Sequence, residues 1–294
     1  MEEISNSSLN SPIWLKKIGL IIIFFICFMM VVSLFSYAGE LFLVKYLSVD
    51  ESTTRKLIKT DSHVMLLYYL FNFTASVFVI YFFWRLIIKK DFFSIGFNDS
   101  QWLKNLILGL LCGIISISLG FTICLIFGFV KVHELIFSFT DIANYLIIFV
   151  LVAISEELMT RGLMLSTLMD GMNDYLALLI VALIFGALHL FNDKVTLLSF
   201  INISIAGLFL GISYVHNRSL WFPIGLHFSW NFFQGPVFGY EVSGHKNASI
   251  IRQTIHGNDT FTGGEFGFEG SIIAMPIMLL AIFAIHIYYS REAI

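Results

Sequence analysis

The sequence predicts an all-α fold, a polytopic transmembrane bundle of about eight spanning helices. Of the 294 residues, 58% are hydrophobic and only 13% are charged, about half the charged share of a soluble domain. Apolar runs of about 18 or more positions recur along the chain, and a helix of that length crosses about 30 Å of hydrocarbon. Such runs pair their backbone groups internally as helices, whereas strands of a membrane barrel are about ten residues long. We therefore expect a multi-pass protein whose first partner is the lipid bilayer.

The first predicted span, about residues 18–37, follows Lys16 and Lys17 as the apolar part of a signal peptide would. The run from Leu20 to Ser36 lacks a clear small-x-small cleavage site and is long enough to cross a membrane. We therefore predict a retained helix. The other predicted spans follow in order at about residues 64–88, 105–130, 142–168, 175–191, 196–216, 219–239 and 271–290.

Two connecting segments are not predicted to cross the membrane. Residues 91–104 mix aromatic and aliphatic residues with polar ones, which suits a piece of chain at the membrane interface. Residues 240–270 contain six glycines together with histidines and charged residues, a composition typical of turns outside the hydrocarbon. This second segment is long enough to cover one mouth of the bundle.

Charge and cysteine usage exclude two classes of partner and cofactor. The net charge is −3 and the basic residues are dispersed, so no nucleic acid partner is expected. The three cysteines lie inside apolar segments without a CxxC pair, where cysteine acts as a small hydrophobe. They therefore indicate neither disulfides nor a metal site built from cysteines. With the N-terminus placed in the cytoplasm, the lysines and arginines divide evenly between the two sides of the membrane, so the positive-inside rule is nearly silent. Lys16 and Lys17, with the cluster Arg85, Lys89 and Lys90, weakly favour cytoplasmic termini.

Ionisable residues interrupt the fourth predicted span. Glu156, Glu157 and Arg161 lie in an otherwise apolar stretch, where an unpaired charge costs several kcal/mol. Glu157 and Arg161 are four residues apart on one helical face, so they can pair. This pair suits a contact between helices as well as a functional role. Glu156 points about 100° away from Glu157, which leaves its carboxylate free for chemistry.

Polar residues at helical spacing also occur in the fifth and seventh predicted spans. Phe185 and His189 are four apart, so the aromatic neighbour can hold the imidazole; His227 and Asn231 are likewise four apart. Taken alone, each histidine could be a hydrogen-bonding residue between helices. Together with the glutamates they predict three helices that converge on one polar pocket.

Such a pocket contains the groups that peptide hydrolysis needs. Glu156 is the candidate base and acid, His189 can hold the same water, and His227 with the Asn231 amide can donate hydrogen bonds to an oxyanion. The sequence shows no Ser-His-Asp set and no cysteine at helical spacing from the histidines, so covalent catalysis is the poorer interpretation. Glu156, His189 and His227 could also bind a divalent metal such as zinc, and without an HExxH motif the sequence does not separate these mechanisms.

Three motifs in this part of the chain resemble those of a known family. EELMTR begins at Glu156, FGALH at Phe185 and HFSWN at His227; their order and spacing are similar to those of the CPBP (Abi) family. This family contains CAAX-processing and bacteriocin-processing intramembrane peptidases, and the Ras-converting CAAX prenyl endopeptidase is its eukaryotic relative. The resemblance extends over about residues 142–290, including SLWFPIGLHFSWNF and TGGEFGFEGS.

The resemblance implies an intramembrane endopeptidase that acts on a membrane-bound or lipidated protein or peptide, in a bacterial cell membrane. It makes Glu156 and His189 the water-activating pair, His227 and Asn231 the oxyanion donors, and Glu157 and Arg161 supporting residues. It also divides the chain into N-terminal spans with an interfacial segment (1–140) and a peptidase core (141–294). A non-catalytic immunity or scaffold protein of the same fold is the alternative. A proton-coupled transporter is a weaker one, because the chain has no internal repeat.

Overall fold

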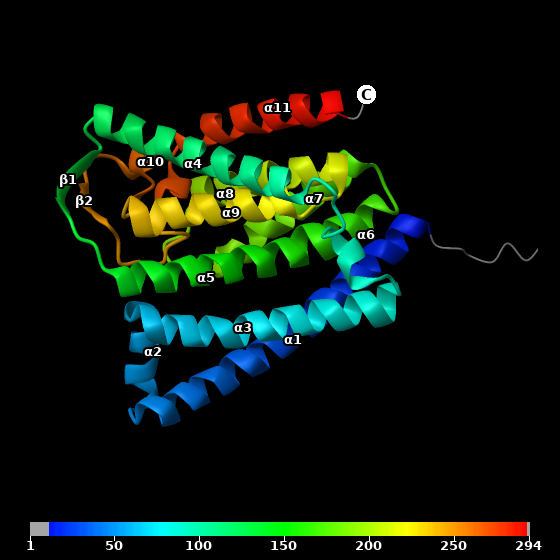
Figure 1. Ribbon diagram of the computed structural model, residues 1–294, viewed down its shortest axis with the longest axis horizontal. Helices are drawn as coiled ribbons and strands as arrows, with labels where there is room; N and C mark the ends of the chain where they lie inside the picture. The colour runs from blue at the N-terminus through cyan, green and yellow to red at the C-terminus, as the bar shows by residue number, and fades with distance from the viewer. Residues whose placement is uncertain (1–11, 293–294) are drawn as a thin grey trace, which may run out of the picture.

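The computed structural model describes residues 12–292 and is a bundle of long helices (Figure 1). Seven helical segments are long and apolar enough to cross a membrane, so the predicted all-α, polytopic class is confirmed. These segments are α1 (Ile13–Leu47), α3 with the π-helical turn after it (Ser62–Ile88), α4 (Trp102–Ile126), α5 through α6 (Phe139–Met169), α7 with its 3₁₀ end (Asp174–Phe191), α8 (Leu197–Asn217) and α11 (Ala274–Glu292).

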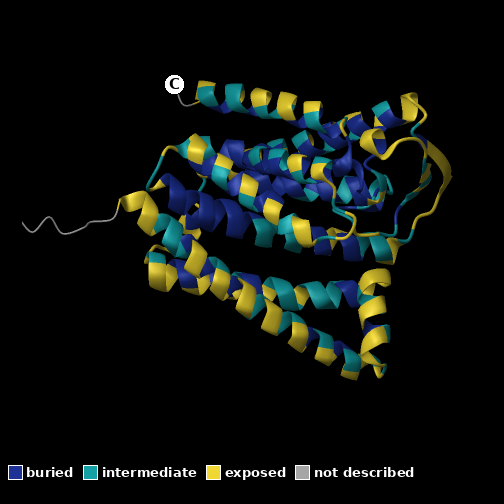
Figure 2. Ribbon diagram, turned by 180° about the vertical axis from the view of Figure 1, so that it is seen from behind, coloured by how far each residue is buried: buried dark blue, intermediate teal, exposed yellow. Residues whose placement is uncertain are grey.

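The predicted span at residues 219–239 is a shorter helix at the centre of the protein. It consists of α9 (Trp221–Phe232) and a π-helical segment, Phe233–Val237, and is too short to count among the seven spans. Most residues of α9 are buried, whereas α1 exposes most of its apolar surface (Figure 2). Protein, rather than lipid, therefore surrounds α9.

The N-terminal part contains more helix than the sequence predicted. α1 extends well beyond residues 18–37 at both ends, and a further helix, α2 (Glu51–Thr60), lies between α1 and α3. The charged side chains of Glu40 and Lys45 end the apolar run without ending the helix, because glutamate and lysine are good helix formers. The Asp50 carboxylate caps α2 by accepting a hydrogen bond from the Thr53 N–H at 3.0 Å. α1, α2 and α3 form a triangle beside the other helices (Figure 1).

A small sheet at one end of the bundle was not predicted. β1 (Val130–Leu135) pairs antiparallel with β2 (Ile251–Ile255), so the predicted third span ends at Ile126 and the 240–270 loop is not made of turns alone. This loop also contains α10 (Asp259–Thr262) and 3₁₀ turns. The two strands are far apart in the sequence, and no local pattern indicates such a pairing.

The segment predicted at the membrane interface, residues 91–104, packs onto the end of the bundle. Its 3₁₀ turn, Phe92–Ile95, buries Ile95 completely. The Asp99 carboxylate accepts hydrogen bonds from Ser219 Oγ and Asn105 Nδ2, both at 2.6 Å. Burial alone would raise the pKa of Asp99, but these hydrogen bonds lower it below its usual value. The carboxylate thereby ties the start of α4 to the start of α9.

Glycines allow α4 to pack directly against α9. A Cβ added at Gly109 would overlap the Phe222 carbonyl oxygen, and one added at Gly225 would lie 2.6 Å from the Leu106 carbonyl oxygen. Small residues of this kind let the backbones of membrane helices approach closely. α4 is therefore a packing partner of α9, the helix that carries His227 and Asn231. The domain boundary predicted at residue 140 stays a prediction.

Gly109→Ala is expected to lower the free energy of unfolding by about 1–3 kcal/mol, because the added methyl group forces two backbones apart. Reversible unfolding in mixed micelles measures this change. Gly19→Ala is the matched control, since a Cβ at Gly19 meets no atom within 4 Å and alanine favours a helix. Equal stability of the two variants would contradict close packing at Gly109.

Candidate active site

The two adjacent glutamates lie at the end of α5 (Phe139–Glu157). From Leu158 to Leu165 the chain continues as a π-helical segment. Such segments are rare in proteins, and those that occur often lie at functional sites. The Glu157 side chain is completely buried, whereas the Glu156 side chain is 31% exposed. Because neighbouring residues on a helix point about 100° apart, one carboxylate lies in the core and the other faces a cavity.

Glu157 and Arg161 form a buried ion pair. Arg161 Nη1 donates to Glu157 Oε1 at 3.0 Å and to Thr160 Oγ1 at 2.8 Å, and Nη2 donates to the Gly207 carbonyl at 2.8 Å. The guanidinium also lies 4.9 Å from the centre of the Phe185 ring. Arg161 therefore connects α5 to α7 and α8 behind the cavity.

His227 lies between the two glutamates. Its Nδ1 is 2.8 Å from Glu157 Oε1 and its Nε2 is 3.9 Å from Glu156 Oε2. An ionised carboxylate only accepts hydrogen bonds, so Nδ1 carries the hydrogen of the shorter contact. Glu157 thereby fixes the orientation of the imidazole, and Nε2 is directed toward Glu156.

His189 is the first residue after α7 (Asp174–Leu188), where the chain tightens into a 3₁₀ turn. Its Nδ1 is 2.8 Å from the Phe185 carbonyl oxygen, and the two rings lie 4.7 Å apart. A carbonyl accepts only, so Nδ1 is the donor and Nε2 is free to accept a hydrogen bond. The neighbour predicted to hold His189 does so through its backbone as well as its ring.

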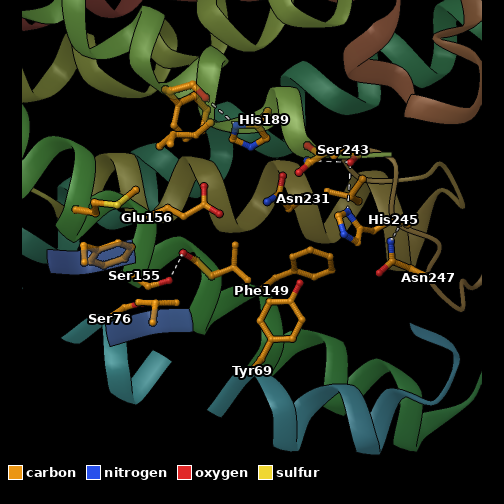
Figure 3. Close-up of a pocket in the computed structure, with 18 residues that line it drawn as sticks. Tyr69, Ser76, Phe149, Ser155, Glu156, His189, Asn231, Ser243, His245 and Asn247 are labelled. Carbon is orange, nitrogen blue, oxygen red and sulfur yellow. Dashed lines mark hydrogen bonds between the residues drawn. The ribbon is translucent and has the colours of Figure 1, made fainter. Parts of the chain in front are cut away.

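A cavity of about 320 Å³ brings these groups together. Glu156, His189 and Asn231 point into the same space (Figure 3). Apolar side chains of α1, α3 and α5 form much of the remaining wall, among them Phe28, Val32, Tyr69, Phe149 and Val152. The arrangement provides a carboxylate, an imidazole and an amide around one space in a helical bundle, groups that can act as a base, a partner for water and an oxyanion donor.

A second cavity of about 30 Å³ adjoins the first. It is lined by His189, His227 and Asn231 together with Ser243 and Glu269 from the 240–270 loop. Burial raises the pKa of Glu269 above its usual value, against the opposing effects of its Ser243 hydrogen bonds and of the two histidines. The site contains a third carboxyl group, that of Glu269.

The region that contains these residues matches a known protein family. Residues 138–233 match the model for Rce1-like type II CAAX prenyl endopeptidases. These residues form an Rce1-like family domain. The Rce1-like domain begins at the N-cap of α5, ends one residue after α9, and contains all six residues predicted from the sequence. Neither the curated proteins nor the solved structures include a significant match to the chain.

The structure places the six predicted residues of the Rce1-like domain in two groups. Glu156, His189, His227 and Asn231 line the cavities, while Glu157 and Arg161 lie behind them. The sequence did not place Ser243, His245 and Glu269 at the site, although all three line a cavity. They follow the Rce1-like domain in a segment of many glycines, where helical spacing gives no signal.

The predicted metal ligands do not converge in the Rce1-like domain. Within residues 12–292, no three histidine, cysteine, aspartate or glutamate side chains are arranged to hold a metal ion. The contacts of His227 Nδ1 with Glu157 and of His189 Nδ1 with a carbonyl leave both Nε2 atoms free, so these hydrogen bonds are compatible with metal binding. It is the spacing of the three side chains that does not fit the zinc site considered from the sequence, and the proposed reaction uses no metal.

Proposed function

We propose that this chain is an intramembrane endopeptidase that hydrolyses a peptide bond of a membrane-bound or lipidated protein or peptide. The observation that carries the proposal is the common cavity of Glu156, His189 and Asn231 beside His227. The match of residues 138–233 to Rce1-like type II CAAX prenyl endopeptidases supports the same chemistry. The proposed substrates include CAAX-like proteins and peptides.

In the proposed reaction Glu156 activates a water molecule. Its carboxylate takes one proton as the water oxygen bonds to the peptide carbonyl carbon, while His189 Nε2 accepts a hydrogen bond from the same water. The amide of Asn231 donates to the oxyanion, and His227 Nε2 donates to it when both imidazole nitrogens carry hydrogen. The C–N bond then breaks, and the proton on Glu156 passes to the leaving amine.

Glu157 and Arg161 contact no reacting atom in this proposal and instead hold other residues in position. Glu157 orients His227, and Arg161 joins Glu157 to the backbone of α8. These contacts keep His227, one of the two oxyanion donors, in place before substrate binds, and preorganised donors lower the barrier more than mobile ones.

The experiment that tests the function is proteolysis by the purified chain in liposomes with membrane-anchored peptides, lipidated and unlipidated, in H₂¹⁸O. Mass spectrometry is expected to find cleavage with one ¹⁸O in the new carboxyl group, because water is the nucleophile. A thorough chelation arm is expected to leave the rate unchanged. Loss of activity on chelation and its return with zinc would replace the proposed mechanism by a metal-dependent one. The scaffold alternative would be supported if no peptide is cleaved and if Glu156→Gln and His227→Ala both retain a cellular function that deletion abolishes.

A further inference from the structure

Glu269 is a buried carboxylate that the proposed mechanism does not use. It lies in the 3₁₀ turn Phe268–Gly270, just before α11, and is 7% exposed. Within residues 12–292, no lysine, arginine or histidine nitrogen comes within ion-pair distance of its oxygens. By contrast Glu265, four residues earlier in the same loop, is exposed and pairs with Lys194 at 2.7 Å. A buried carboxylate without a cation is costly, so its placement requires an explanation.

Several contacts hold Glu269 in this position. The Glu269 Oε2 atom accepts hydrogen bonds from the Ser243 N–H at 3.0 Å and from Ser243 Oγ at 2.8 Å. The Asn202 amide of α8 donates to the carbonyls of Glu269 and Ser271 at 2.8 and 2.7 Å. Ser243 itself adopts a left-handed backbone conformation, with φ of 48°, which is unfavourable for a residue with a side chain. Strained residues of this kind cluster at functional sites.

Glu269 and both imidazoles line the same cavity of about 30 Å³. It has room for a water molecule, and its walls provide several polar partners for one. His227 already has the Glu157 carboxylate on its Nδ1, whereas the Nδ1 of His189 contacts only a neutral carbonyl. The other charged groups near the imidazoles are Glu156, Glu157 and Arg161, from α5 and its π-helical continuation.

We propose that Glu269 is a positioning residue whose negative charge makes His189 Nε2 a stronger hydrogen-bond acceptor for the attacking water. Both nitrogens of His189 already have partners, so Glu269 acts across the small cavity by the charge of its carboxylate, and Ser243 holds this carboxylate in place. The proton balance of the reaction is unchanged, because Glu269 neither takes nor gives a proton. This inference rests on the proposed peptidase function.

The test combines kinetics with a measurement that does not need activity. Glu269→Gln keeps the shape of the side chain and an acceptor for Ser243 but removes the charge, so kcat is expected to fall about 10-fold to 100-fold, as the loss of a nearby charge in a protein interior does, with KM nearly unchanged. In protein with ¹⁵N-labelled histidine, the His189 ring resonances, assigned with His189→Gln, are expected to move in this variant. Ser243→Ala is expected to move them in the same direction by a smaller amount.

Glu265→Gln is the matched control, because it removes an exposed carboxylate from the same loop. It is expected to leave both the kinetics and the His189 resonances in place. Unchanged His189 resonances in Glu269→Gln overturn the role of Glu269, as does an equal response of the Glu265 variant. Absence of cleavage by the wild-type chain overturns the proposed function instead, and the resonances still decide whether Glu269 acts on His189.

Discussion

Glu156→Gln is expected to lower the rate of peptide cleavage by about 1,000-fold, within the range of general acid–base catalysis. Glutamine has the shape of glutamate but cannot take a proton from water or return one to the leaving amine. The Glu156 side chain has no ion pair closer than the 3.9 Å contact with His227 Nε2 among the described residues, so the exchange breaks little structure. Initial rates in liposomes, at saturating and at low peptide concentrations, measure the effect.

The control for this prediction is Glu134→Gln, the same exchange at an exposed position of β1. It is expected to cleave at the wild-type rate. Both variants should unfold at the wild-type temperature, which separates lost chemistry from lost structure. If Glu156→Gln and His227→Ala both retained activity, the assignment of the active site to these helices would be wrong.

The position of the two glutamates explains how adjacent identical residues can have different tasks. Glu157 is buried against Arg161 and His227, so its charge is committed to structure. Glu156 faces a cavity and has no such partner. One turn of helix therefore provides both the reactive carboxylate and the carboxylate that fixes the imidazole beside it.

Much of this site could be predicted from the sequence, because its geometry follows from helical spacing. Glu157 and Arg161, four residues apart, form the expected pair, and His227 and Asn231 lie near the same cavities. The sequence also indicated that His189 contacts Phe185. In each case the two partners belong to one helix or its immediate end, so their separation in the chain determines their separation in space.

Contacts between distant segments could not be predicted in this way. The pairing of β1 with β2 joins residues more than 100 positions apart. Glu269 and Ser243 line a cavity together with the histidines, in a loop that several glycines with positive φ turn, among them Gly263 and Gly267. The composition of the loop indicated turns, but it carried no information about which helices the turns would face.

Arg161→Leu is expected to lower the free energy of unfolding by about 3–5 kcal/mol, because it leaves the fully buried carboxylate of Glu157 without its cation. Reversible unfolding in mixed micelles measures this loss. Glu157 Oε2 and Arg161 Nε have no hydrogen-bond partner within residues 12–292, so the pair itself is incompletely satisfied.

The double variant Glu157→Leu, Arg161→Leu is therefore expected to regain much of the lost stability, since a buried pair can be replaced by apolar residues at little cost. It should nevertheless remain inactive, because His227 loses the carboxylate that orients it. Arg85→Met provides the control: its pair with Asp91 is exposed, and such pairs contribute about 0–1 kcal/mol. A double variant no more stable than Arg161→Leu would show that the guanidinium acts through its contacts with Gly207 and Phe185 and not through the charge of Glu157.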